Sequence, residues 1–223
     1  MWRAQLGAPR TRWLWLLACA ATLVVGCNWI GAAAYYLGPR RMQKPEHTLT
    51  QQRLAIVVDR APAVEESPIF ERTLHETLVK VFEERKVKTQ VIPLRELDDL
   101  RRDHPEFESW SLQRIGRELN AEEVLNLYVD ELRFRERPDH PVLEPRVRLR
   151  AKVIGVNQPA DKARLWPASG AEVRPVACSR DTKAADSQRV LDEESAKLAK
   201  DTAQIVATFF YEVDLDEKTP REP

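Results

Sequence analysis

Glycine and histidine are scarce in this chain of 223 residues, and each scarcity argues against a class of function. Seven glycines do not supply a glycine-rich phosphate-binding loop. The four histidines are spread along the chain, and Val79 stands four residues after His75, so the two-histidine zinc pattern is absent. No serine lies in a nucleophile-elbow motif. The sequence therefore predicts a protein that is not an enzyme, with no catalytic residue, no cofactor and no metal site.

Cysteine is also rare, and the three cysteines are Cys19, Cys27 and Cys178. The first two lie in an apolar amino-terminal region, so Cys178 is alone in the rest of the chain and has no partner for an internal disulfide there. Its strand-like neighbours predict a small apolar core residue.

Net charge is absent as well, because 35 basic residues balance 35 acidic ones. Residues 1–27 contain Arg3, Arg10 and Arg12 and no acid, so a chain without them would have 32 basic and 35 acidic residues. A mildly acidic domain lacks the positive field that attracts nucleic-acid phosphates. The sequence therefore predicts no nucleic-acid partner.

The amino terminus contains the most specific motif of the chain. Three arginines precede the uncharged run 13–25, which has the length of a signal-peptide core. The run ends at Val24-Val25-Gly26-Cys27, which resembles the bacterial lipobox. That resemblance implies cleavage before Cys27 and a diacylglycerol on its sulfur, with acyl chains such as palmitate anchoring the protein in a membrane. It divides the chain into a signal peptide, 1–26, and a lipidated cysteine with its tether, 27–52.

An uncleaved membrane helix is the alternative for this region. The uncharged stretch continues to Tyr36, and residues 13–36 are long enough to span a bilayer as a single-pass signal anchor. Both interpretations place a tethered domain in the bacterial cell envelope, facing the periplasm. Asn28, rather than aspartate, follows the lipobox cysteine, which favours the outer membrane.

Residues 53–213 predict one α/β (α+β) domain, followed by a flexible tail, 214–223. The expected order is β-α-β-α-α-β-β-β-β-α, a single mixed β-sheet with helices packed on it. The expected elements are strand 53–59, helix 67–86, strand 88–93, short helices around 94–100 and after Ser111, strands 123–136 and 146–156, a hairpin of 163–167 with 172–178, and helix 188–213.

Local signals fix several details of these elements. Ser67 and Pro68 suit a helix start, and Asn120 is placed to end the short helix after Ser111. The apolar alternation in strand 123–136 changes phase after Val129, which predicts a β-bulge near Asp130.

The stretch Ile115-Gly116-Arg117-Glu118-Leu119-Asn120-Ala121-Glu122-Glu123-Val124-Leu125 resembles the helix-turn-strand of CsgG-like and TolB amino-terminal-like envelope domains. The resemblance covers residues 53–213 as topology, and about a dozen positions in detail. Asn120 stands where that turn often has glycine, and Asn126-Leu127 also departs from the pattern. The resemblance implies envelope assembly or scaffolding by protein contact. No pore-forming hairpin is evident, so a secretion channel is not implied.

A row of basic residues is the main surface feature that the sequence predicts. Residues 146–152 alternate apolar and basic side chains, and further arginines follow the bulge in the preceding strand. If the two strands pair, one sheet face gathers Arg133, Arg135, Arg146, Arg148, Arg150 and Lys152. Glu131 and Glu136 are available to neutralise them, in which case the row is simply a solvated face.

These observations leave three functional hypotheses. The first is an envelope lipoprotein whose non-catalytic domain acts in protein–protein interaction or envelope assembly. The second is a module that binds a lipid or another amphiphile, with the basic row meeting anionic headgroups. The third is a hydrolase, which the absence of a catalytic motif disfavours.

Overall fold

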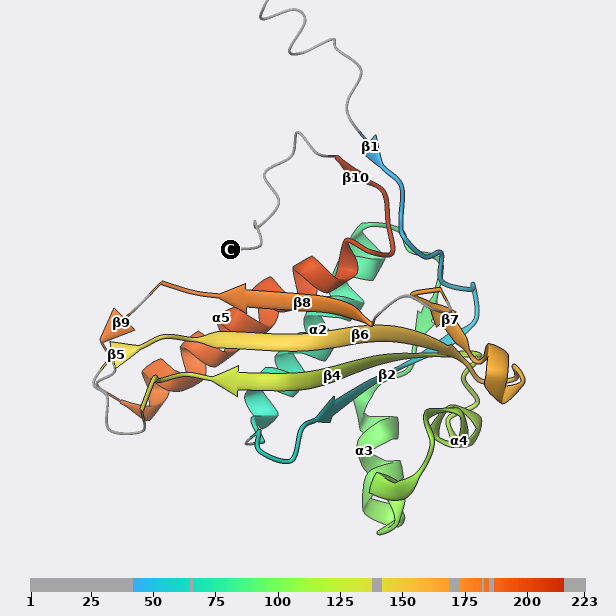
Figure 1. Ribbon diagram of the computed structural model, residues 1–223, viewed down its shortest axis with the longest axis horizontal. Helices are drawn as coiled ribbons and strands as arrows, with labels where there is room; N and C mark the ends of the chain where they lie inside the picture. The colour runs from blue at the N-terminus through green and yellow to red at the C-terminus, as the bar shows by residue number, and fades with distance from the viewer. Residues whose placement is uncertain are drawn as a thin grey trace, which may run out of the picture. The chain divides into compact units, whose positions relative to one another are not determined.

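Figure 1 shows a computed structural model of the chain, which describes residues 42–64, 66–137, 142–168, 173–181, 183–184 and 187–214. The lipobox, the segment 13–36 and the tail after Asp214 lie outside the described residues. The folded unit begins at Met42. Within the described part of the chain, no helix has both the length and the apolarity to cross a bilayer.

A six-stranded mixed sheet forms the centre of this unit. Strand β2 pairs in parallel with β3 and β4, and β6 pairs antiparallel with β4, β7 and β8. The predicted fold class is therefore confirmed. The strands are β3 (Gln90–Val91), β2 (Arg53–Arg60), β4 (Glu123–Arg133), β6 (Arg146–Gly155), β7 (Arg164–Trp166) and β8 (Arg174–Ser179).

The hairpin expected of β7 and β8 is wrong. Both strands pair with the same edge of β6, with Trp166 opposite Val153 and Arg174 opposite Ala151. They therefore run in one direction as two parts of an interrupted strand. Pro167 directly follows β7, and since proline has no backbone N–H to donate, it ends the ladder there.

Helices α2 (Pro68–Glu84) and α5 (Gln188–Ala207) cover one face of the sheet. Ser67 caps α2 as predicted, because its hydroxyl accepts a hydrogen bond of 3.4 Å from the backbone N–H of Phe70. The carboxy-terminal helix ends before the predicted Val213. Phe209 and Phe210 then pack beside Trp166, with ring centroids 5.3 and 5.4 Å from it.

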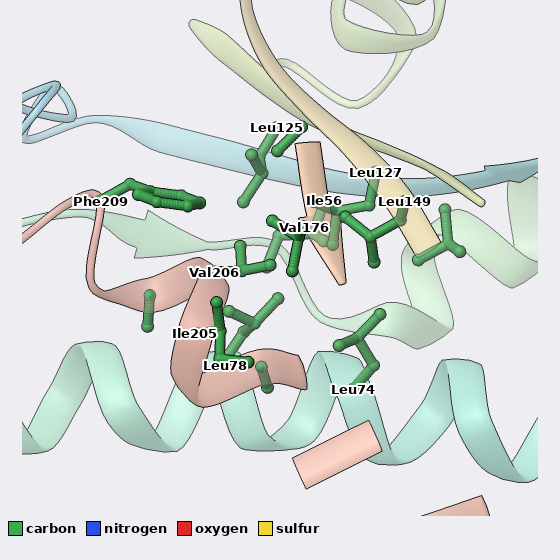
Figure 2. Packing of buried hydrophobic residues seen from close by; sticks show 14 of the residues in the cluster. Ile56, Leu74, Leu78, Leu125, Leu127, Leu149, Val176, Ile205, Val206 and Phe209 are labelled. Atoms are coloured by element: carbon green, nitrogen blue, oxygen red, sulfur yellow. The ribbon is translucent and has the colours of Figure 1, made fainter. Parts of the chain in front are cut away.

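The main hydrophobic core lies between the sheet and these two helices. Figure 2 shows Leu74 and Leu78 extending from α2 toward the sheet, whose strands contribute Ile56 and Leu149 to the same core. Each large apolar side chain buried in this way contributes about 1.5–3 kcal/mol. Cys178 is a buried member of the same core, so the prediction that it is a core residue is confirmed.

The opposite sheet face is covered at one end by α3 (Leu94–Asp103), η1 (Phe107–Ser109) and α4 (Leu112–Glu118). These elements bury a second apolar cluster that includes Val57 and Val124. Helix α4 ends before Asn120, whose φ of 51° is the left-handed conformation that asparagine tolerates, so the predicted stop is confirmed. The other end of this face is not covered by these helices.

Short elements complete the fold. Strand β1 (Met42–Gln43) pairs antiparallel with β10 (Val213–Asp214), which joins the start of the domain to its end. Strand β5 (Val142–Leu143) pairs with β9 (Lys183–Ala184), and η2 (Ala160–Lys162) precedes β7.

Candidate functional site

The basic row predicted from the sequence lies on the sheet face opposite α2 and α5. In β6, Val147, Leu149, Ala151 and Val153 are buried in the main core, so the alternate side chains point to the other face. Arg146, Arg148 and Arg150 are exposed there, whereas Lys152 is half-buried. Arg133 pairs across from Arg146. Arg135 follows the end of β4 and is half-buried.

A β-bulge brings carboxylates to these arginines. The register of β4 against β6 shifts between Val129 and Glu131, so the predicted bulge near Asp130 is confirmed. The bulge places Asp130 and Glu131, although adjacent in sequence, within reach of arginines on the same face. Arg150 donates two hydrogen bonds to Asp130, of 2.9 Å from Nε and 2.7 Å from Nη2. Arg148 Nε lies 2.7 Å from a carboxylate oxygen of Glu131.

Two further ion pairs extend this arrangement. Arg146 lies 2.9 Å from Glu144, and Arg133 lies 3.2 Å from Glu131. We call the whole set the charged ladder. Each of its arginines has a carboxylate partner, so four arginines are matched by three carboxylates and the face has little net charge. The ladder comprises Asp130, Glu131, Arg133, Glu144, Arg146, Arg148 and Arg150.

Lys152 belongs to a different environment. It pairs across from Asn126, whose side chain is buried with 1% exposure. Burial lowers the pKa of Lys152, and the positive charge of Arg164 lowers it further, while Asp59 acts in the opposite direction. The basic row is therefore interrupted at its inner end by a partly desolvated lysine.

A polar pair of one buried and one half-buried side chain lies beside Lys152. The amide nitrogen of Asn126 donates a hydrogen bond of 2.6 Å to the carboxylate of Asp59, at the end of β2. Burial raises the pKa of Asp59, and the hydrogen bond from Asn126 and the charge of Arg101 only partly offset that effect. The sequence analysis missed this pair, because a single asparagine inside an apolar strand gives no sign of its partner.

An open cavity of about 680 Å³ adjoins Asp59, and we call it the polar cavity. Arg101 of α3 contributes to its wall and donates a hydrogen bond of 3.1 Å to the carbonyl oxygen of Val58. Trp110 is 8% exposed, and the guanidinium of Arg114 lies 3.9 Å from its ring centroid. The walls include Asp59, Arg101, Phe107, Trp110, Leu112 and Tyr128.

Two N–H groups in these walls are buried without an acceptor. Neither the indole Nε1 of Trp110 nor the Nε of Arg101 has a hydrogen-bond partner among the described residues. Buried donors are paired in the great majority of native sites, and an unpaired one costs about 1–3 kcal/mol. Both atoms are closed off from the open space, so these unused donors lie in the packing behind the cavity and not on its accessible wall.

A second cavity, of about 860 Å³, lies where β4 ends beside the starts of α2 and α5. Its walls mix apolar side chains, such as Ile69, Leu132 and Leu191, with charged ones, such as Glu66 and Arg133. Within the described residues, no group of three or more His, Cys, Asp or Glu side chains is placed to hold a metal ion.

Comparison with protein families finds no match to the chain, and neither does comparison with curated protein sequences. Among solved structures, the PelC dodecamer from Paraburkholderia phytofirmans is 17% identical, with a TM-score of 0.37 over 78% of this chain and 97% of that one. Lipoprotein GNA1162 from Neisseria meningitidis is 12% identical, with a TM-score of 0.39 over 66% of this chain and 92% of its own. A putative lipoprotein from Caulobacter crescentus is 15% identical, with a TM-score of 0.31 over 67% and 84%. Lipoproteins are thus among the similar structures, but similarity at this level assigns no function to the chain.

Proposed function

We propose that the chain is a lipid-anchored protein of the bacterial envelope, and that its folded domain binds another envelope protein through the charged ladder without catalysing a reaction. The lipobox at Val24-Val25-Gly26-Cys27 supports the anchor. The pairing of every ladder arginine with a carboxylate, on a part of the sheet that the described helices leave uncovered, supports a protein partner, and this observation carries the binding part of the proposal.

The pairing of charges distinguishes a protein partner from a lipid surface. Anionic headgroups attract a face with a net positive field, but each ladder arginine has a carboxylate within 3.2 Å. Ion pairs fixed in this way give little long-range attraction, yet they discriminate strongly between partners whose charges do and do not complement their arrangement. A protein surface whose charges complement those of the ladder is therefore the partner that fits this face best.

The tether limits where that partner lies. Fourteen residues separate Cys27 from Met42, so even a fully extended connection reaches only about 50 Å. A domain held by lipid at Cys27 thus stays close to one membrane. We infer that its partner is in that membrane or lies against it.

Exchanging Arg148 and Glu131 tests the ladder. The double variant Arg148→Glu with Glu131→Arg keeps an ion pair between these two positions but reverses it, and it removes the carboxylate partner of Arg133, so the charge order of the ladder changes. Circular dichroism checks that the variant is folded. A photocrosslinking residue at the exposed Ala177 of β8, next to Arg148, should form an adduct in native membranes with the original order and lose it with the exchanged order.

A crosslinker at Lys80 on the outer face of α2 is the matched control, because its side chain is 72% exposed and lies on the other face. Equal adducts from both positions, or an adduct that survives the exchange, would contradict binding through the ladder.

The anchor has a separate test in Cys27→Ala. Intact mass measurement of the membrane-extracted protein should show loss of residues 1–26 and a gain of acyl mass in the wild type only. An uncleaved signal anchor would instead retain residues 1–26 in both proteins, and membrane association would not depend on Cys27.

The cavity beside β4, α2 and α5 supports a second candidate function, which is the binding of a lipid or another amphiphile. Its volume suits a small-molecule site, and Leu132 and Leu191 give it apolar walls. Native mass spectrometry of the extracted wild type and of Leu191→Glu would test this candidate. A non-covalent lipid present in the first and absent from the second is the supporting result.

A further inference from the structure

Strand β8 forms an open edge of the sheet. Among the described residues it pairs only with β6, and Figure 1 shows it at the margin of the sheet. In an antiparallel pair, residues whose backbone groups bond to the neighbouring strand alternate with residues whose groups point away from it. Arg180, just after β8, donates its N–H to the carbonyl oxygen of Pro145. Alternation from this bond turns the backbone groups of Ala177 and Ser179 toward the open edge.

The rest of the described chain does not use these backbone groups. Neither Ala177 nor Ser179 takes part in a backbone hydrogen bond outside the sheet among the described residues, and both residues are exposed. Pro175 has no N–H to donate, so the usable edge is the second half of the strand. Such an edge is a template to which an extended segment of another chain can be added as a further strand.

The sheet face is hollowed beside this edge. A depression of about 390 Å³ lies over the start of β6 and the end of β8, and we call it the ladder hollow. Arg133, Arg146 and Arg148 are in its walls together with Ala177 and Ser179. Arg148 pairs across from Ala177, and Arg146 from Ser179. Because the two residues of β8 are small, they do not separate the arginines from the open edge.

The ladder members around this hollow have a surplus of positive charge. Three arginines, Arg133, Arg146 and Arg148, are matched there by two carboxylates, those of Glu131 and Glu144. The side chains of Arg146 and Arg148 are 52% and 67% exposed, and each meets its carboxylate through one nitrogen. A guanidinium has five N–H donors, so both retain donors for an external acceptor. A carboxylate is the acceptor that also supplies the missing negative charge.

A segment added to β8 would bring such a carboxylate within reach. Neighbouring strands lie about 4.8 Å apart, so an added strand would lie about 10 Å from β6. An arginine of β6 and an acidic side chain of the added strand can together span that distance across the small residues of β8. The fourth arginine at the hollow, Arg180, already has Glu194 and Asp201 as partners.

We propose that the partner of the charged ladder contributes an extended acidic segment, which is added as a strand to the open edge of β8 and places an aspartate or glutamate in the ladder hollow. The inference rests on the proposed function and names the kind of segment that the ladder recognises. Backbone hydrogen bonds to Ala177 and Ser179 hold the segment, and its carboxylate accepts hydrogen bonds from Arg146 and Arg148. A second copy of this chain fits less well, because pairing two β8 edges would set two hollows with the same surplus of arginine beside each other.

A photocrosslinking residue at the exposed Pro175 tests strand addition in native membranes. Ala177→Pro removes an outward N–H without removing a charge or a hydrogen bond to β6. Ala177→Ser is the matched control, because it keeps that N–H. We expect the adduct to decrease about tenfold or more in Ala177→Pro and to persist in Ala177→Ser.

The acidic chemistry of the segment has its own test. Arg146→Gln removes a charge from the hollow and should decrease the Pro175 adduct about threefold or more. Arg95→Gln is the control, because that side chain is 90% exposed on α3, and it should leave the adduct unchanged. Mass spectrometry of the adduct should identify a partner peptide with an aspartate or glutamate within about five residues of the crosslink.

The outcomes separate this inference from the ladder proposal, provided that circular dichroism shows each variant folded. An adduct that survives Ala177→Pro but is lost on exchanging Arg148 and Glu131 would contradict strand addition and leave the ladder proposal standing. An adduct that survives both changes would contradict both. No adduct from Pro175, a partner peptide without an acidic residue, or an adduct between two copies of this chain would each overturn the inference.

Hydrogen exchange of the unaltered chain gives a measurement that needs no variant. The amides of Ala177 and Ser179 should exchange about tenfold more slowly in native membranes than in the detergent-extracted protein, because the added strand accepts from them. The amide of Cys178 faces β6 and should change less. Equal exchange of Ala177 and Ser179 in the two preparations would overturn the inference.

Discussion

Asp130 accepts two hydrogen bonds from Arg150, although the strand register places Tyr128 and not Asp130 opposite that arginine. The bulge in β4 makes this possible by adding a residue between Val129 and Glu131. Regular alternation would instead point Glu131 into the core and Leu132 into solvent. One inserted residue thus keeps Leu132 on the core side and places two of the three carboxylates of the charged ladder, those of Asp130 and Glu131.

We expect Asp130 and Arg150 to be energetically coupled. A double-mutant cycle with Asp130→Ala and Arg150→Ala, measured by urea unfolding, should give a coupling energy of about 0.5–1 kcal/mol. The bidentate geometry strengthens the pair, whereas the 34% and 45% exposure of the two side chains weakens it. The coupling should fall in high salt. The exposed pair Arg95 and Asp99, with atoms 3.8 Å apart, should give a smaller value. Equal coupling energies in the two cycles would show that the bidentate geometry does not strengthen the ion pair.

Much of this fold was predictable from the sequence because several of its features depend on interactions within a few neighbouring residues. The cap at Ser67 depends on one hydroxyl and one amide three residues away, and the stop at Asn120 depends on a single backbone conformation. The bulge was visible as a change of phase in the apolar alternation. Each of these features is encoded within a few residues, so the sequence alone was sufficient.

Features that depend on distant contacts were not predicted correctly or were missed. A break at Pro167 between two short apolar runs suits a hairpin as well as an interrupted strand, and only pairing with β6 distinguishes them. The polar cavity gathers Asp59 of β2, Arg101 of α3 and Trp110, which follows η1. No spacing rule relates these residues, so their meeting follows from the packing of α3 and η1 on the sheet.

Gly116 of α4 packs closely against Val124 of β4 and Val156, which follows β6. A Cβ atom at this position would lie 2.4 Å from Cγ2 of Val156 and 2.9 Å from Cγ2 of Val124. We therefore expect Gly116→Ala to lower the free energy of unfolding by about 1–3 kcal/mol, even though alanine favours helices. Adding Val156→Ala should recover part of the loss, because it removes the nearest methyl groups. Urea unfolding measures both effects, and a stabilising Gly116→Ala would show that the helix shifts freely.

Glu123 holds the segment that contains His47 and Thr50 against the sheet. Its buried carboxylate accepts hydrogen bonds from the backbone N–H and the hydroxyl of Thr50, at 2.9 and 3.2 Å, and lies 3.6 Å from His47. Burial alone would raise the pKa of Glu123, but the contacts with His47 and Thr50 outweigh it, so the pKa is lowered. These contacts therefore stabilise the fold above the ordinary pKa of 4.5, and the contribution is lost as the pH falls through the lowered value.

Glu123→Ala should accordingly lower the free energy of unfolding by about 1.5–3 kcal/mol near neutral pH. Hydrogen exchange at the Thr50 amide should accelerate by more than exchange in α2. The exposed Glu118 provides the control, since Glu118→Ala should change neither quantity appreciably. Unchanged exchange at Thr50 would show that other contacts hold this segment.

His75 gives the fold a pH dependence that can be isolated by substitution. The imidazole is 5% exposed, and its Nε2 lies 3.2 Å from the carbonyl oxygen of Ile92, so the neutral ring donates there. Burial lowers the pKa of His75 below its ordinary value of 6.5, and the hydrogen bond with Ile92 offsets only part of this. Between the lowered pKa and 6.5, the unfolded chain binds more protons than the folded one. The free energy of unfolding should therefore decrease as the pH falls through this interval.

His75→Gln keeps a donor for Ile92 but does not titrate, so its free energy of unfolding should vary less than that of the wild type between about pH 7.5 and about pH 5. Subtracting the two curves removes the opposite contributions of Asp59 and Glu71, whose pKa values are raised by burial. The exposed Arg72 on the same helix is the control, since Arg72→Gln removes no group that titrates in this range and should follow the wild-type curve. Parallel curves for His75→Gln and the wild type would mean that the folded protein protonates His75 as readily as the unfolded chain does.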